Sequence, residues 1–134
     1  MPETYSPADL LKLLGIAVIV GLAHLFWGAL AARRQQGLKW ARGPRDEPMP
    51  VNGMAARLER AFANFRETFP LFAAALISVV LAGKTGPIPY WGAVVYVAGR
   101  ALYLPSYAFA FGARTFIWMA STLGLVAVVA GLFL

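Results

Sequence analysis

Long apolar stretches occupy most of this 134-residue chain and constrain its fold more than any other feature. A helix needs about 20 apolar residues to cross a bilayer, and four stretches meet that length: approximately 10–32, 54–82, 90–109 and 115–134. Only 13% of the residues are charged, compared with about 25% in a typical soluble domain. We therefore predict one all-α domain over residues 1–134, an integral membrane four-helix bundle with four transmembrane helices.

Two other classes of protein fit this sequence poorly. Transmembrane strands alternate apolar and polar residues over about ten positions, whereas these stretches are continuously apolar. The net charge of +6 would suit nucleic acid, but the basic residues cluster beside the apolar stretches, where they orient membrane spans. The chain has one histidine and no cysteine. We therefore expect no nucleic-acid partner and no metal site.

The ends of the first apolar stretch carry recognisable signals. Ser6 is a suitable N-cap, Pro7 a suitable first helical residue, and Asp9 completes a capping box three residues after the cap. Arg33 and Arg34 follow the stretch, which is typical of a retained anchor rather than of a cleaved signal peptide.

The distribution of charge predicts the orientation of the chain in the membrane. Segment 33–53 contains five Lys and Arg residues and three prolines, and we expect it to be an ordered or partly ordered loop. Segment 83–89 contains a single basic residue, Lys84. By the positive-inside rule, loop 33–53 is cytoplasmic. Four spans then place both termini on the outer side.

Polar residues interrupt the second apolar stretch. A helix advances about 100° per residue, so one narrow face, about 80° wide, carries four of them: Arg57, Arg60, Asn64 and Glu67. Glu59 and Arg66 point the opposite way. We expect these two to form an interfacial pair, or Arg66 to extend toward lipid head groups.

The third stretch has a polar face of its own. Four residues fall within about 60° on a helical wheel: Tyr96, Arg100, Tyr103 and Tyr107. Pro105 lies among them and is expected to kink the helix. Arg114 lies next to the start of the fourth stretch, at the same depth. Because charges within a span face protein or a wet cavity, we expect the two polar faces to meet. Their excess of arginine suits a small anionic ligand, since guanidinium groups bind carboxylates bidentately.

Other interpretations of these polar residues stay open at this point. Arg100 and Glu67 would also form a buried structural pair, with Asn64 bonding two helices together. A small multidrug transporter would use Glu67 as its coupling acid, but the surrounding arginines would hold that carboxylate ionised. His24 stands alone in an apolar stretch, and we expect it to pack or to make a local hydrogen bond.

Two segments, "ERAFANFRETFPLF" (59–72) and "GRALYLPSYAFAFGAR" (99–114), resemble the MAPEG family of membrane-associated proteins in eicosanoid and glutathione metabolism. The family pattern Arg-Ala-x-x-Asn-x-x-Glu-x-x-Pro is matched by Arg60, Ala61, Asn64, Glu67 and Pro70. The family also has a tyrosine, a second tyrosine four residues later and an arginine eleven residues after the first tyrosine. Tyr103, Tyr107 and Arg114 match this second pattern. The segments look closest to the bacterial members.

The resemblance implies a homotrimer in a bacterial inner membrane, with glutathione bound as a cosubstrate between subunits on the cytoplasmic side. Carried over by position, five residues would bind glutathione: Arg60, Asn64, Glu67, Tyr103 and Tyr107. Arg57 and Arg100, from the same polar faces, complete the expected binding set. Arg114 would be catalytic and would stabilise the glutathione thiolate. The implied activity is a glutathione-dependent transferase or peroxidase acting on hydrophobic small molecules, and membrane lipid is the surrounding partner.

Three positions depart from the eicosanoid-synthesising members of the family. Phe62 stands where those enzymes have a glutamine, Thr68 where the leukotriene-forming members have a tyrosine, and Phe109 where they have an arginine. These departures keep open an alternative function, a MAPEG-fold protein that binds lipid or a partner without catalysis.

Overall fold

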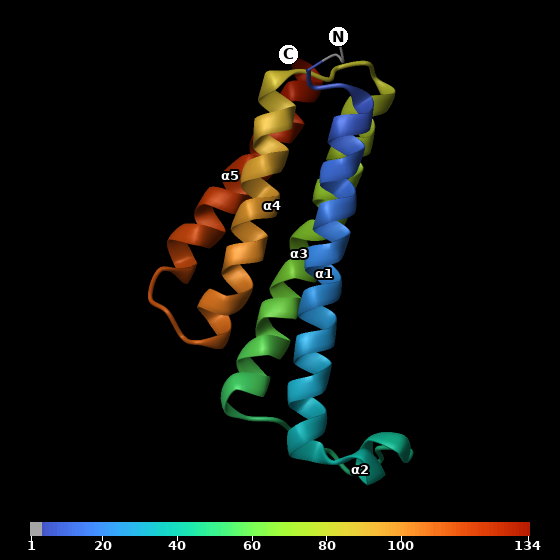
Figure 1. Cartoon of the computed structure of the whole chain (residues 1–134), viewed down its shortest axis with the longest axis vertical. Helices are drawn as coiled ribbons and strands as arrows, with labels where there is room; N and C mark the ends of the chain where they lie inside the picture. Colours follow the sequence, from blue (N-terminus) through green and yellow to red (C-terminus); the bar gives the residue numbers. More distant parts are fainter. Residues whose placement is uncertain (1–3) are drawn as a thin grey trace.

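The computed structural model describes residues 4–134, and its long helices run side by side along one axis (Figure 1). Residues 4–134 form five helices: α1 (Pro7–Gln36), α2 (Leu38–Arg42), α3 (Gly53–Leu81), α4 (Pro87–Ala108) and α5 (Arg114–Phe133). No strand occurs between residues 4 and 134. The prediction of an all-α fold is therefore confirmed.

Helix α1 begins at its predicted capping box. The side chain of Ser6 accepts a hydrogen bond from the Asp9 backbone N–H at 3.2 Å, and the Asp9 carboxylate accepts one from the Ser6 N–H at 3.2 Å. At its other end, α1 continues to Gln36 rather than ending near position 32. The polar tail Arg33–Gln36 extends the helix because these are good helix formers.

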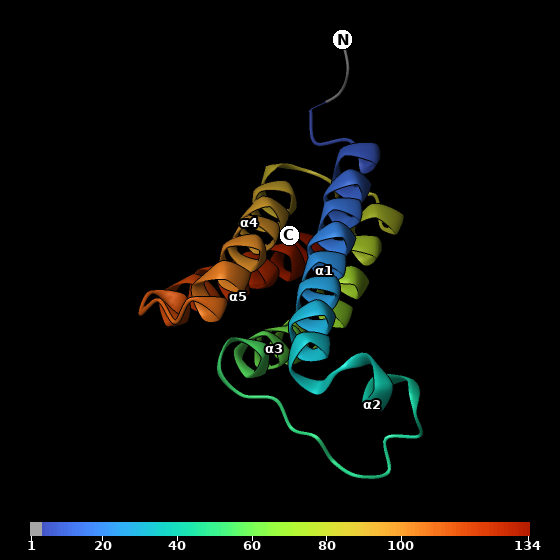
Figure 2. The same ribbon diagram turned by 60° about the horizontal axis from the view of Figure 1, so that its bottom comes forward.

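The short helix α2 lies inside the segment expected to be a loop. Figure 2 shows α2 and the chain that follows it extending away from the four long helices, at the end of the bundle opposite to the end of α5. Its sequence is LKWAR. Five residues are too few to produce a recognisable helical period, so the sequence pattern did not predict it.

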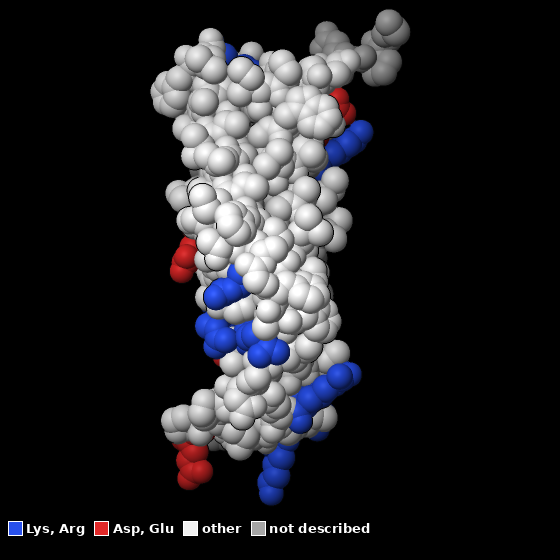
Figure 3. Space-filling model, turned by 90° about the vertical axis from the view of Figure 1, so that its left-hand side faces the viewer, with Lys and Arg blue, Asp and Glu red and all other residues white. Residues whose placement is uncertain are grey.

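Three of the long helices are long and apolar enough to cross a membrane: α1, α3 and α5. α4 is not among them, because Arg100, four tyrosines and three prolines lower its mean hydropathy. The prediction of four spans is thus confirmed for three helices and stays a prediction for α4. Apolar side chains such as Ile19 (64% exposed), Phe26 (65%) and Leu123 (67%) cover the exterior. Figure 3 shows that charged side chains lie mainly in the half of the molecule that carries α2.

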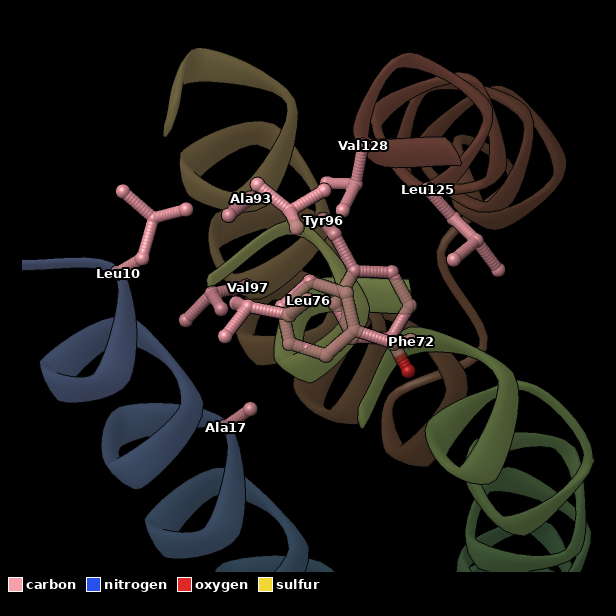
Figure 4. Packing of buried hydrophobic residues seen from close by; sticks show 10 residues of the cluster. Leu10, Ala17, Phe72, Leu76, Ala93, Tyr96, Val97, Leu125 and Val128 are labelled. Carbon is pink, nitrogen blue, oxygen red and sulfur yellow. The ribbon is translucent and has the colours of Figure 1, made fainter. Parts of the chain in front are cut away.

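The main core lies where α1, α3, α4 and α5 meet (Figure 4). The rings of Phe72 and Tyr96 stack at a centroid distance of 4.0 Å, and the Tyr96 hydroxyl makes a 2.9 Å hydrogen bond with the Thr68 hydroxyl. Tyr96 is fully buried. It therefore belongs to the core, although the sequence pattern grouped it with the polar face of α4.

Small residues let α4 and α5 pack closely. A Cβ atom added to Gly92 would lie 2.7 Å from the Gly124 carbonyl oxygen, and one added to Gly99 would lie 2.7 Å from Ser121 Cβ. The Ser121 hydroxyl donates a hydrogen bond of 3.0 Å to the Tyr96 carbonyl oxygen. Close backbone approach at small residues is a common way for membrane helices to associate.

We expect Gly124→Ala to lower the free energy of unfolding by about 1–3 kcal/mol, the usual cost of overpacking. The added Cβ would lie 2.5 Å from the Gly92 carbonyl oxygen, which is a backbone atom rather than the end of a flexible side chain. Gly15→Ala is the matched control, because a Cβ there meets nothing within 4 Å. The free energy of unfolding of both variants is measured in the same detergent. Equal losses in the two variants would contradict the close-packing explanation.

Candidate functional site

The predicted polar faces of α3 and α4 meet in the half of the molecule that carries α2. Eight predicted residues form what we call the polar cluster: Arg57, Arg60, Asn64, Glu67, Arg100, Tyr103, Tyr107 and Arg114. They come from α3, α4 and the first residue of α5. Hydrogen bonds join the α3 and α4 members directly. The expectation that these two faces lie against each other is confirmed.

Arg100 is the buried member of the polar cluster, with only 1% of its surface exposed. Its Nη2 donates a hydrogen bond of 2.9 Å to Asn64 Oδ1. The guanidinium also lies 4.6 Å from the ring centroid of Tyr103 and 5.8 Å from that of Phe65. Glu67 is exposed, so Asn64 takes the place of that carboxylate as the partner of Arg100. The guanidinium thus links α4 to α3 from inside the bundle.

Two arginines converge on Tyr107 nearer the surface. Arg60 Nε donates a hydrogen bond of 3.1 Å to the Tyr107 hydroxyl. The guanidinium of Arg114 lies 4.5 Å from the centroid of the same ring. Tyr103 packs edge-on against Tyr107 at 5.5 Å. Because cations are attracted to aromatic faces, Tyr107 holds arginines from α3 and α5 close together despite their like charge.

Arg57 has a different position from the other arginines. Its Nε donates a hydrogen bond of 2.9 Å to the carbonyl oxygen of Ala108, the last residue of α4. The final carbonyl groups of a helix lack partners within the helix, and a cation is favourable there. Arg57 therefore stabilises the end of α4 and fixes it against the start of α3.

A cavity of about 230 Å³ opens beside these groups. Three members of the polar cluster line it, Asn64, Tyr103 and Arg114, together with Thr115 and Trp118. The sequence pattern missed the last two. Trp118 lies one helical turn after Arg114 and so shares its face, which is the signal that would have found it. Its buried indole Nε1 has no hydrogen-bond partner within residues 4–134.

The three positions that depart from the eicosanoid-synthesising enzymes do not line this cavity. The Thr68 hydroxyl is bonded to Tyr96 in the core. Phe109 packs against Trp27 at 5.8 Å. The guanidinium of Arg66 lies over the Phe62 ring, 4.8 Å from its centroid. The expected pairing of Arg66 with Glu59 stays a prediction.

His24 has the structural role that the sequence suggested. It is fully buried, its Nδ1 is 2.9 Å from the Val20 carbonyl oxygen, and its ring stacks on Phe65 at 4.9 Å. A local hydrogen bond and packing thus account for its place in an apolar helix.

Comparison with known proteins agrees with the resemblance noted in the sequence. The family model described as MAPEG family matches residues 13–134, nearly the whole chain. No curated protein matches the chain. Together with the three apolar helices, the family match identifies an integral membrane protein.

The Arg100–Asn64 bond makes a prediction about stability. Asn64→Leu removes the partner of a buried guanidinium, and hydrogen bonds to charged groups contribute about 1.5–3 kcal/mol. We expect a loss of that size in the free energy of unfolding. The double variant Asn64→Leu/Arg100→Met removes the stranded charge as well and should lose less. The free energy of unfolding of the single and the double variant is measured in detergent. A double variant less stable than Asn64→Leu alone would refute this explanation.

Proposed function

The chain belongs to the MAPEG family, and from that premise we propose that it binds glutathione and transfers the thiolate to lipophilic electrophiles. One observation carries the proposal. Arg114 lines the cavity and also lies over Tyr107, the residue to which Arg60 is bonded. Cationic groups from α3 and α5 are thereby assembled beside one cavity at the polar end of the bundle.

The chemistry of glutathione suits this set of residues. Its two carboxylates match the excess of arginine, since guanidinium groups bind carboxylates bidentately. We assign a carboxylate to Arg60 and Tyr107, and the peptide groups to Asn64 and Tyr103. Glu67 is exposed at the same face and would accept the α-ammonium group of the tripeptide. Arg57 and Arg100 act as positioning residues in this proposal, because each is bonded within the chain.

Arg114 is the proposed catalytic residue. A nearby cation favours the thiolate form of a thiol, and the thiolate is the nucleophile. The thiol proton passes to water before attack. With an aryl halide, the sulfur then adds to the ring carbon, and the carbon–halogen bond breaks afterwards as halide leaves to solvent. The product is a thioether. The lipophilic substrate reaches the site from the surrounding bilayer.

The size of the cavity supports a site shared between subunits. Ligand pockets commonly measure about 300–1,000 Å³, whereas this cavity has about 230 Å³. Arg60 and Glu67 are exposed beside it. We propose that a neighbouring subunit of a homotrimer completes the site, as the family resemblance implies.

We further propose that loop 33–53 is cytoplasmic in a bacterial inner membrane and that both termini lie outside, because basic residues concentrate in that loop.

A second candidate function is a MAPEG-fold protein that binds lipid or a partner without catalysis. The positions of Thr68 and Phe109 favour it, since neither adds a polar group to the cavity. The two candidates differ in turnover. A trimer that binds a lipid head group in the cavity, binds no glutathione and fails to consume an aryl halide would support the second.

Calorimetric titration with glutathione tests the binding proposal. Arg60→Ala should weaken binding by about tenfold or more, since it removes one charged contact to a carboxylate. Arg66→Ala is the matched control on the same helix, because that side chain lies over Phe62 and not in the polar cluster. Equal affinities for wild type and both variants would count against the assignment of Arg60.

Turnover tests the role of Arg114. With 1-chloro-2,4-dinitrobenzene as substrate, Arg114→Ala should lower kcat by about 100-fold, the usual effect of losing one preorganised group that stabilises developing or persistent negative charge. Glutathione should still bind, because Arg60 and Tyr107 remain. A variant with unchanged kcat, or one in which only KM rises, would show that Arg114 does not stabilise the thiolate.

A further inference from the structure

The segment between α1 and α3 has a defined shape. The Gln35 side chain makes two hydrogen bonds to the backbone of Asn52, donating to the carbonyl oxygen at 2.9 Å and accepting from the N–H at 3.0 Å. Gln36 Nε2 donates to the Met49 carbonyl oxygen at 2.8 Å. The last turn of α1 thus holds the returning chain. Because α1 and α3 are both membrane-spanning by length and composition, this segment lies at a membrane surface, whichever surface that is.

A second cavity, of about 580 Å³, lies in this segment between α2 and turn 43–47. Lys39, Trp40 and Arg45 are among the residues that line it. Trp40 Nε1 donates a hydrogen bond of 2.9 Å to the Glu47 carbonyl oxygen, and the Arg45 guanidinium lies 5.4 Å from the Trp40 ring. Arg45 has a positive φ of 58°, and its Nε donates to the Ala41 carbonyl oxygen at 2.9 Å. These contacts fix Arg45 at the edge of the cavity.

The segment around this cavity is more basic than the cavity lining itself. Asp46 and Glu47 also line it, so the cavity itself carries both signs. The whole segment 33–53 nevertheless contains five basic and two acidic residues. Leu38 is 60% exposed and Met49 is 40% exposed. Basic residues beside a span attract anionic lipids, and Trp and Leu side chains enter the interfacial layer.

We propose that this second cavity binds the head group of an anionic phospholipid. Lys39 and Arg45 bind its phosphate, while Leu38 and Trp40 lie in the interfacial layer beside the bundle. Figure 2 shows that α2 extends sideways from the end of α1, and basic residues beside the end of a span lie at the level of lipid head groups. The net positive charge of the segment selects an anionic head group over a zwitterionic one. This site is separate from the polar cluster and does not depend on glutathione binding.

Thermal unfolding of the full chain in a neutral detergent tests this proposal. Phosphatidylglycerol added to the micelles should raise Tm by about 4 °C or more, because a ligand that binds only the folded state stabilises it. Phosphatidylcholine and phosphatidylethanolamine should give smaller shifts. The triple variant Lys39→Gln/Arg42→Gln/Arg45→Gln, which also removes the basic residue at the end of α2, should lose at least half of the phosphatidylglycerol shift. Lys84→Gln removes a basic residue from the α3–α4 turn at the other end of the bundle, and this variant should keep the whole phosphatidylglycerol shift.

A charge-preserving variant guards against misfolding of the triple variant. Lys39→Arg/Arg42→Lys/Arg45→Lys keeps the net charge and should keep most of the phosphatidylglycerol shift. Loss of that shift in both triple variants, or its full retention in the glutamine variant, would overturn the proposal. An equal shift with phosphatidylethanolamine would assign the cavity to a zwitterionic head group and overturn it too. None of these three results would bear on glutathione binding.

Discussion

The hydrogen bond from Arg100 to Asn64 sets the arrangement of the polar half of this molecule. It joins the middle of α3 to α4 at a point where Arg100 is buried and Asn64 is half-buried. Because α4 is fixed there, Tyr107 comes to lie beside Arg60 one to two turns further along. The Tyr107 ring in turn positions Arg114, at the start of α5. The cavity that we assign to glutathione thus depends on Arg100, an arginine that does not line it.

The bundle is divided into two parts with different packing. In one half, Phe72, Tyr96 and the small residues of α4 and α5 make a dense apolar core. In the other half, arginines are held by aromatic rings and by single hydrogen bonds rather than by carboxylates. A rigid half beside a polar half is a useful arrangement for a binding protein, since the core preserves the geometry of groups that would otherwise repel one another.

The sequence predicted the helices well because long apolar stretches and a capping box are local signals. It also predicted that the polar faces of α3 and α4 meet, since helical periodicity fixes which residues share a face. It did not predict that Glu67 is exposed while Arg100 is buried. A helical wheel shows which side of a helix a residue lies on, but it does not show how deeply that residue is buried. α2 was missed because it is short, and Trp118 was missed because its only signal was its position one turn after Arg114 on the same face.

The low mean hydropathy of α4 has a consequence for how the chain is made. A helix with a central arginine partitions poorly into lipid by itself. In chain order, α3 emerges from the ribosome before α4, so Asn64 is already in place to accept the Arg100 guanidinium. The glycine-lined surface of α5 follows directly and covers the other side. The order of the helices therefore means that Arg100 is synthesised after Asn64, its hydrogen-bond partner in the folded bundle.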